Sequence, residues 1–273
     1  MKYLLIIIFV SWSINISRAQ EKWVLSSVYL EKPDTVLVFK PRNYNKVQSY
    51  PLVYLLHGYS ENYKQWAQTT DLQKLADQYG FMIITPDGFT TYYINSPLKH
   101  GVQFETFFFK ELVPKVHRSF NIDAKNIFIS GLSMGGYGAL RYFILHQDYF
   151  NSAGAMSGAL DIDAAIFRAA SRAFWSSDRM VNDLSAHLGV PENHNWNQYS
   201  IFNLVRQNPG FNRPFIFDCG TEDILYPASA RLKRLTDSLE IPATFISRPG
   251  THNTAYWQQA VDYHFLYFKQ RLK

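Results

Sequence analysis

The stretch that most constrains how this chain can fold covers residues 126–140 and reads NIFISGLSMGGYGAL. It begins with a short apolar run typical of a buried strand, passes through glycines and continues into a segment that favours a helix. At the junction, Gly131-x-Ser133-x-Gly135 matches the strand–turn–helix motif that projects a serine hydroxyl above a sheet. We predict a strained turn at Ser133, where side chains at Gly131 and Gly135 would collide with the turn.

Short apolar runs alternate with longer helix-compatible stretches along the rest of the chain. The expected strands are Trp23–Leu30, Thr35–Phe39, Leu52–Leu56, Phe81–Thr85, Asn126–Ser130, Pro214–Cys219 and Ala243–Ser247. The expected helices are Asp71–Tyr79, Phe104–Phe120, Met134–His146, Pro227–Leu239 and a last one that begins near Thr254. This alternation is typical of an α/β fold with a mostly parallel central sheet and helices on both faces, here opened by two antiparallel strands. Residues 160–210 break the pattern and are expected to form a short insertion over the active site.

The N-terminal segment has the features of a signal peptide. A basic second residue precedes the apolar run Tyr3–Trp12, and Ser17 and Ala19 supply the small residues of a cleavage site. We therefore expect residues 1–19 to be removed, Gln20 to begin the mature chain, and the protein to be exported to the periplasm or secreted. The apolar run is too short to span a bilayer comfortably, so we expect no stable membrane insertion.

The length, charge and cysteine content of the chain limit its domain organisation and its partners. Residues 20–273 suffice for a single catalytic α/β domain with a large core. The formal charge of +5 would fall to +3 without Lys2 and Arg18, and the remaining basic residues are dispersed, so we expect no nucleic-acid partner. The single cysteine, Cys219, follows an apolar run, and we expect it to be buried at the end of a strand.

Chain order supplies partners for the serine. A serine hydroxyl becomes a nucleophile when a base takes its proton, and a carboxylate must orient that base. In the strand–turn–helix arrangement these partners follow the serine in the order acid, then histidine. We predict Ser133 as the nucleophile, Asp223 as the acid and His252 as the base, each on a loop after an expected strand. Glu222 and Asp218 are the alternatives for the acid.

Two backbone N–H groups should receive an oxyanion. One belongs to Met134, directly after the serine, and the other to Tyr59, in the loop that begins with His57-Gly58. The chain has no H-E-x-x-H sequence and no Cys/His cluster, and Asp161-x-Asp163 is too short a fragment to indicate calcium. We therefore expect no metal and no cofactor.

Aromatic side chains near these loops are candidates to stack on a sugar or a phenolic acid, although aromatic residues also fill protein cores. The aromatic candidates are Tyr59, Trp66, Tyr92, Tyr93, Trp175 and Trp196. From these and the neighbouring loops we predict substrate contacts by His57, Trp66, Tyr93 and Trp196. His194, in the expected insertion, is a further candidate.

Four motifs together resemble the esterase D family of α/β-hydrolases. They are LLHG at 55–58, TPDG at 85–88, GLSMGGYGA at 131–139 and GTED at 220–223. That family includes S-formylglutathione hydrolases, tributyrin esterases, feruloyl and acetyl-xylan esterases, and the mycolyltransferases of antigen 85. The resemblance runs from about residue 23 to the C-terminus and implies an α/β-hydrolase fold.

The resemblance also implies roles for particular residues. The family's triad maps onto Ser133, Asp223 and His252, and its oxyanion donors map onto Tyr59 and Met134, in agreement with the choices made from the residues. After the histidine this chain reads Asn-Thr where many members have an aspartate and an aromatic residue. That difference leaves the triad intact.

An exported member of this family is expected to be a serine carboxylesterase acting on feruloyl or acetyl esters of plant polysaccharides. The alternatives are a tributyrin-type esterase for short acyl chains and an S-formylglutathione hydrolase-like thioesterase, whose cytosolic substrate an exported enzyme would not meet. A peptidase is disfavoured because about thirty residues of the expected mature chain precede Leu52, too few for a propeller domain. An inactive carbohydrate-binding relative is disfavoured by the intact triad. Acyl and alcohol specificity and oligomeric state stay open.

Overall fold

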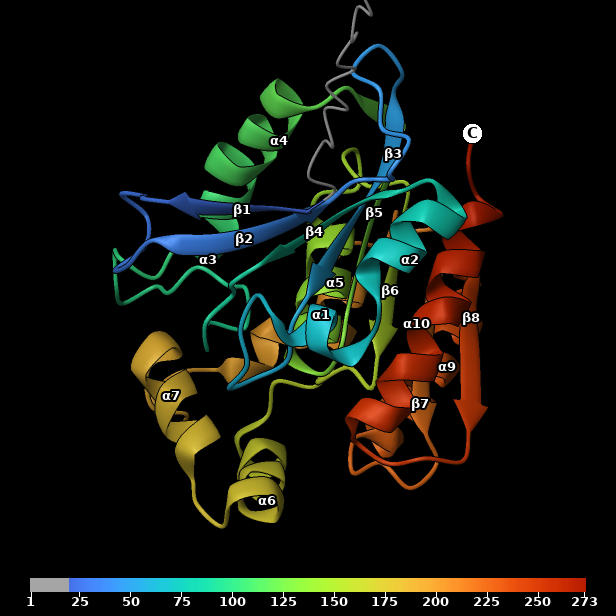
Figure 1. The fold of residues 1–273 in the computed structure, drawn as a ribbon. Coiled ribbons are helices and arrows are strands. Elements are labelled where there is room, and N and C mark those ends of the chain that lie inside the picture. The colour runs from blue at the N-terminus through green and yellow to red at the C-terminus, as the bar shows by residue number, and fades with distance from the viewer. Residues whose placement is uncertain (1–19) are drawn as a thin grey trace, which may run out of the picture.

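The computed structural model describes residues 20–273 and shows one eight-stranded sheet with helices on both faces (Figure 1). The predicted signal peptide lies outside these described residues. Within residues 20–273, no helix is both long and apolar enough to cross a lipid bilayer.

The sheet has the strand order β1-β2-β4-β3-β5-β6-β7-β8. Its strands are β1 (Gln20–Leu25), β2 (Asp34–Phe39), β3 (Tyr50–Leu56), β4 (Met82–Pro86), β5 (Ile122–Gly131), β6 (Ser152–Met156), β7 (Phe215–Gly220) and β8 (Ala243–Arg248). β1 pairs antiparallel with β2, and β2 pairs antiparallel with β4, whereas the pairs from β4 to β8 are parallel. The predicted mostly parallel sheet opened by antiparallel strands is confirmed.

The helices connect these strands. They are α1 (Gln65–Thr69), α2 (Leu72–Tyr79), α3 (Phe104–Phe107), α4 (Val113–Ser119), α5 (Met134–Leu145), α6 (Ala164–Trp175), α7 (Arg179–Leu188), α8 (Ile201–Gln207), α9 (Tyr226–Ser238) and α10 (Thr254–Lys269). A π-helical turn (Phe108–Leu112) joins α3 to α4, and a short 3₁₀ turn (Trp196–Tyr199) precedes α8.

Two apolar cores lie on opposite faces of the sheet, because successive strand side chains alternate between faces. On β3, Val53 and Leu55 pack with side chains of α1, α2 and α10, whereas Tyr54 and Leu56 pack with those of α4, α5, α8 and α9. All four β3 side chains are fully buried. The central strands are therefore covered on both sides, as their continuous apolar sequences predict.

Three elements differ from the sequence prediction. The first strand ends at Leu25, and Ser27 then turns the chain by accepting a hydrogen bond from the Tyr29 N–H (3.0 Å). The predicted helix 104–120 contains the π-helical turn directly before Pro114, which lacks the N–H needed to continue the α-helical ladder. β6 was not predicted, because its small residues carry little apolar signal.

The insertion over residues 160–210 is mainly helical. α6 and α7 (yellow in Figure 1) lie beyond the carboxyl ends of the central strands, and we call these two helices the cap. The last part of the insertion, α8, packs on α5 in the body of the domain. The cap thus stands over the edge of the sheet where loops from several strands meet.

Candidate active site

Ser133 sits at the sharp turn between β5 and α5. Its backbone has φ 53° and ψ −116°, a strained conformation for a residue with a side chain. The Ser133 N–H donates to the Met156 carbonyl (2.9 Å), and the Ser133 carbonyl accepts from the Tyr137 and Ala159 N–H groups (3.1 and 3.0 Å). Hydrogen bonds on both sides of the residue therefore hold the turn in place.

The flanking glycines are required by the close approach of backbone at this turn. A Cβ atom on Gly131 would lie 2.4 Å from the Gly135 carbonyl carbon, and one on Gly135 would lie 2.2 Å from the Leu56 carbonyl oxygen. No side chain tolerates contacts this short against backbone. The predicted steric need for glycine two residues before and after Ser133 is confirmed.

The structure brings Ser133, His252 and Asp223 together from three separate loops. His252 Nε2 lies 3.0 Å from Ser133 Oγ, and His252 Nδ1 lies 2.8 Å from Asp223 Oδ2. The other carboxylate oxygen, Asp223 Oδ1, accepts the Leu225 N–H (2.8 Å). Burial alone would raise the pKa of Asp223, but the hydrogen bond and charge of His252 outweigh it and lower that pKa below its usual value. The acid is thus held ionised beside the imidazole.

The two alternative acids lie elsewhere. Asp218 Oδ2 is 2.7 Å from Nε2 of His264, whose Nδ1 is 2.8 Å from Ser130 Oγ, and all three side chains are buried. Glu222 is exposed, and its backbone N–H donates to the Gly250 carbonyl. Neither carboxylate contacts His252. The buried pair of Asp218 and His264 was not anticipated from the sequence, in which His264 reads as one position of an amphipathic helix.

Residues 57–61, which contain the predicted oxyanion donor and are called the oxyanion loop below, lie beside Ser133. His57 Nε2 accepts the Gly88 N–H (2.7 Å), which fixes the proton on Nδ1, and this Nδ1–H donates to the Gly58 carbonyl (2.8 Å). The Gly58 N–H in turn donates to Gln65 Oε1 (2.8 Å). These bonds hold both sides of Gly58, and with them the peptide plane that carries the Tyr59 N–H.

The Tyr59 and Met134 amides are available as donors. Within residues 20–273, neither N–H donates to another protein group. Met134 is the first residue of α5, where N–H groups have no partner in the helix and the helix dipole favours negative charge. Gly58 and Tyr59 line the same pocket as Ser133. The positions are those that an oxyanion hole for an attack by Ser133 needs.

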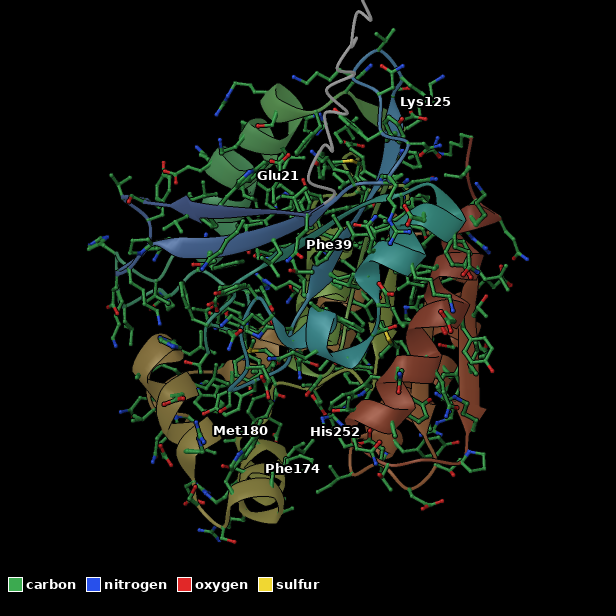
Figure 2. All side chains as sticks on the ribbon, in the orientation of Figure 1. Glu21, Phe39, Lys125, Phe174, Met180 and His252 are labelled. Carbon is green, nitrogen blue, oxygen red and sulfur yellow. The ribbon has the colours of Figure 1, made fainter. Side chains whose placement is uncertain are left out.

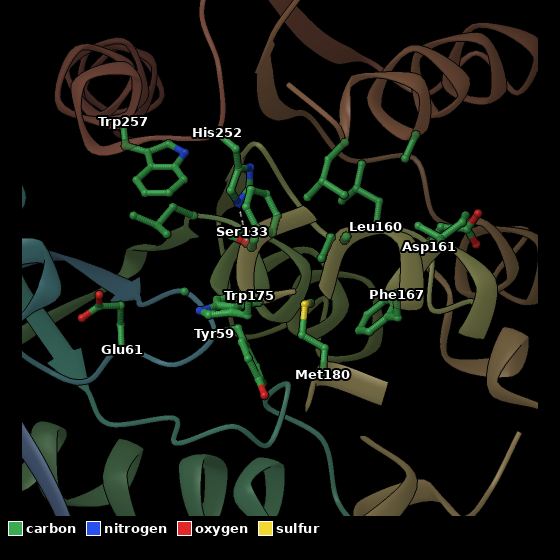
Figure 3. A pocket seen from close by; sticks show the side chains of 18 of the residues that line it. Tyr59, Glu61, Ser133, Leu160, Asp161, Phe167, Trp175, Met180, His252 and Trp257 are labelled. Atoms are coloured by element: carbon green, nitrogen blue, oxygen red, sulfur yellow. Dashed lines mark hydrogen bonds between the residues drawn. The ribbon is translucent and has the colours of Figure 1, made fainter. Parts of the chain in front are cut away.

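A cavity of about 300 Å³ opens at Ser133 and His252 (Figure 3). Its walls are mostly apolar and come from the cap on one side and from the loops after β3, β7 and β8 on the other. Among the aromatic residues singled out from the sequence, Tyr59 and Trp175 line it. Lining residues that the sequence did not single out include Leu160, Phe167, Phe174, Met180 and Trp257.

Four predicted substrate contacts do not reach this cavity, which corrects the sequence-based assignment. His57, Trp66, Tyr93 and Trp196 are each between 0 and 3% exposed. Each uses its polar atoms inside the protein: the Trp66 and Trp196 indoles donate to the Leu56 and Gly189 carbonyls, and the Tyr93 hydroxyl donates to the His57 carbonyl. These residues support the loops around the site. Tyr92 is also fully buried, and His194 is exposed outside the cavity.

Aromatic rings enclose the imidazole of His252. The Phe174 ring lies 5.1 Å from it at 34°, and the Trp257 ring lies 5.0 Å away, edge on. Figure 2 shows Phe174 reaching from the cap towards His252 on the opposite wall. Phe174 is 40% exposed, although large apolar side chains are normally buried. Because Phe174 lines the cavity, a substrate bound there would cover part of its exposed ring.

The single cysteine does not line this cavity. Cys219 is buried at the end of β7, as predicted, and burial raises the pKa of its thiol. Among residues 20–273, no group of three or more His, Cys, Asp or Glu side chains is arranged to hold a metal ion.

Comparison with known proteins identifies the family. A model of the family described as "Putative esterase" matches residues 27–268. The chain belongs to this esterase family. An acetyl esterase from Caldicellulosiruptor saccharolyticus is 27% identical to the esterase over 250 residues, which are 86% of this chain and 92% of that protein. The resemblance seen in the motifs is thereby confirmed, and the protein is a carboxylic ester hydrolase.

Solved structures agree with the fold. A ferulic acid esterase superposes on the esterase with a TM-score of 0.77 at 24% identity, covering 93% of this chain and 98% of that one. The S-formylglutathione hydrolase FrmB from Staphylococcus aureus superposes with a TM-score of 0.74 at 19% identity, covering 92% and 98%. At these identities the likeness shows the shared fold and leaves the substrate open.

Proposed function

We propose that the esterase is a serine carboxylesterase that works through an acyl-enzyme, with Ser133 as nucleophile, His252 as base and Asp223 as orienting acid. The observation that carries this proposal is the continuous chain of contacts from Asp223 Oδ2 to His252 (2.8 Å) and from His252 to Ser133 Oγ (3.0 Å). This chain ends in an apolar cavity beside two unused amide donors. Nucleophile, base and oxyanion donors thus face one space.

The reaction follows from this geometry. Ser133 Oγ attacks the ester carbonyl while His252 Nε2 takes the hydroxyl proton, and Asp223 stabilises the imidazolium that forms. The carbonyl oxygen becomes an oxyanion and accepts hydrogen bonds from the Tyr59 and Met134 N–H groups. His252 then gives the proton to the leaving alcohol. Water repeats the sequence on the acyl-enzyme and releases the carboxylic acid.

The cavity supports an aromatic acyl group. Phe167, Phe174, Trp175 and Trp257 provide ring faces and edges in a space of about 300 Å³, a volume at the lower end for small-molecule sites. A planar phenolic acid fits such walls better than an acetyl group, which would leave them exposed to water. We therefore propose a feruloyl ester of plant polysaccharide as the substrate class.

Short acyl esters are the second candidate. The observation that favours them is the acetyl esterase relative, which matches most of this chain. In this case the cavity would hold the alcohol side of the ester, with the aromatic rings against a sugar ring.

We also propose that the esterase is exported, as residues 1–19 predict. N-terminal analysis of protein recovered from the periplasm or the medium tests this. A mature chain that begins at Gln20 supports export, and a full-length chain confined to the cytoplasm contradicts it.

Initial rates on methyl ferulate, p-nitrophenyl acetate and p-nitrophenyl butyrate test the activity, with the Ser133→Ala variant as control. We expect the wild type to prefer methyl ferulate and the variant to lose about 10⁴-fold or more in kcat. A preference for the acetyl ester moves the substrate class to short acyl groups. Near-normal turnover by a folded Ser133→Ala protein refutes the mechanism.

A further inference from the structure

The cap is tied to the oxyanion loop by polar side chains of α7. The Tyr59 hydroxyl donates to Asp183 Oδ2 over 2.6 Å, and Arg179 Nη2 donates to Ser60 Oγ over 3.1 Å. The Arg179 guanidinium also lies over the rings of Tyr59 and Trp175, 5.4 and 5.2 Å from their centres. Two neighbouring residues of the loop are therefore held by one helix of the cap.

Together with contacts from the core, these contacts restrain Tyr59 and the peptide that joins it to Gly58. From the core, His57 and Gln65 hold the carbonyl and the amide of Gly58, and so one side of the peptide that carries the Tyr59 N–H. From the cap, Asp183 holds the far end of the Tyr59 side chain. Figure 3 shows this side chain running away from Ser133, with its hydroxyl at the distal end. The backbone N–H and the hydroxyl of Tyr59 thus serve different partners.

The backbone conformation of the oxyanion loop explains why such restraints are needed. Ser60, directly after Tyr59, has φ 69° and lies in the left-handed region that residues with side chains seldom adopt. Without support, such a residue would favour a different backbone conformation, which would turn the adjoining peptide between Tyr59 and Ser60 and so shift the backbone of Tyr59. The bond from Arg179 to Ser60 Oγ and the bond from Tyr59 to Asp183 both oppose this change.

We propose that Asp183 is a positioning residue for ester hydrolysis, which holds the Tyr59 hydroxyl and thereby aims the Tyr59 N–H at the oxyanion. Arg179 assists it through Ser60. This inference rests on the proposed function, since it assigns a role within the same oxyanion hole. It also couples the cap to the chemistry, because a displacement of α7 would move a donor that stabilises the transition state.

The surroundings of the Tyr59 side chain favour the hydrogen bond from its hydroxyl to Asp183. Burial raises the pKa of the Tyr59 hydroxyl well above its usual value, and the bond to Asp183 raises it further, so this hydroxyl keeps its proton into alkaline solution. The side chain is 6% exposed and packs against the Tyr92 and Trp175 rings. A hydrogen bond partly shielded from water in this way is electrostatically stronger than a bond at the surface.

The test compares Tyr59→Phe with Tyr92→Phe. Both variants lose one phenol oxygen from stacked neighbouring rings, but the Tyr92 hydroxyl is buried without a hydrogen-bond partner among the described residues. We expect Tyr59→Phe to lower kcat about 10- to 100-fold with KM changed less than threefold, as for a misplaced catalytic group. Tyr92→Phe should stay within threefold of the wild type. Asp183→Ala should resemble Tyr59→Phe, and Asp183→Asn, which keeps an acceptor oxygen, should recover part of the rate.

A second readout separates positioning from a merely structural role. Phenylboronic acid forms a tetrahedral adduct with an active-site serine and serves as a transition-state analogue. Its inhibition constant should rise in Tyr59→Phe by the factor by which kcat/KM falls. A lower melting temperature with unchanged kcat and unchanged boronate inhibition would overturn the role of Asp183 while leaving the serine mechanism standing. Activity that survives Ser133→Ala would instead overturn the proposed function, and this role with it.

Discussion

Replacing Asp223 with asparagine tests the triad most sharply, because the structure fixes how the new amide must sit. In the wild type, Asp223 Oδ1 accepts the Leu225 N–H and Oδ2 accepts the His252 Nδ1–H, both at 2.8 Å. An amide has one acceptor oxygen and one NH₂ group. Since the Leu225 N–H can only donate, the oxygen stays on that side and the NH₂ faces His252.

This orientation reverses the tautomer of the His252 imidazole. Facing an NH₂ donor, His252 Nδ1 must give up its proton and accept, so the proton moves to Nε2, which can then no longer take the proton of Ser133. Turning the amide over restores the tautomer but sets two donors against each other at Leu225, at a cost of about 1–3 kcal/mol for an unmade hydrogen bond. The variant also lacks the negative charge that stabilises the imidazolium. Together we expect a loss of about 10⁴ in kcat, about 5.5 kcal/mol of transition-state stabilisation.

Steady-state rates at neutral pH measure this loss, and thermal unfolding checks that the nearly isosteric variant folds. Glu222→Gln is the matched control, because it makes the same chemical change at the exposed neighbouring residue. We expect that control to stay within twofold of the wild type. If Asp223→Asn kept more than a tenth of the activity, or if Glu222→Gln were the severe variant, the assignment of the acid would be refuted.

Two further predictions concern stability. Burial raises the pKa of Glu105, but hydrogen bonds and charge from His146 and Arg141 outweigh it and lower that pKa, so its contribution is present at neutral pH and is lost as pH falls through the lowered value. Glu105→Gln should therefore cost about 2 kcal/mol at pH 7, and urea unfolding should show the difference disappearing as the pH falls below this lowered pKa. His264→Ala would leave Asp218 buried and unpaired and should cost about 3–5 kcal/mol, whereas His194→Ala at an exposed site should cost little. A stable His264→Ala protein would contradict this reading of the buried pair.

The three residues of the proposed triad could be predicted because each lies next to a local signal in the sequence. Ser133 sits in a turn that only small neighbours allow, and Asp223 and His252 follow the strands β7 and β8. These strands are adjacent and parallel, so their carboxyl ends bring the two loops to the same edge of the sheet. Chain order was enough to predict these residues, with Glu222 and Asp218 left as alternatives for the acid, and the structure shows which of their atoms meet.

The pocket could not be predicted in the same way. Sequence indicates that aromatic residues are present, but not whether a given ring faces the cavity or the core. The indole N–H groups of Trp66 and Trp196 donate to backbone carbonyls, whereas Phe174, which packs against His252, was not predicted from the sequence to line the cavity. β6 escaped prediction for a related reason: Gly154 is small because a Cβ atom there would lie 2.2 Å from Nδ1 of His264. A distant partner, absent from any local window, dictates that residue.

The sheet and the cap hold different parts of the proposed site. This separation predicts which substitutions should change substrate specificity. The strain at Ser133, about 1–3 kcal/mol for such a backbone, is held by bonds to Met156 and Ala159 within the body of the domain. One wall of the cavity instead comes from α6 and α7, which contact the proposed triad and oxyanion loop through residues that include Phe174, Asp183 and Arg179. Substitutions on the cavity-facing side of the cap should therefore alter KM and substrate preference while kcat survives. Substitutions that cut the contacts of Asp183 should lower kcat for every ester alike, because they act on the shared oxyanion donor rather than on the substrate.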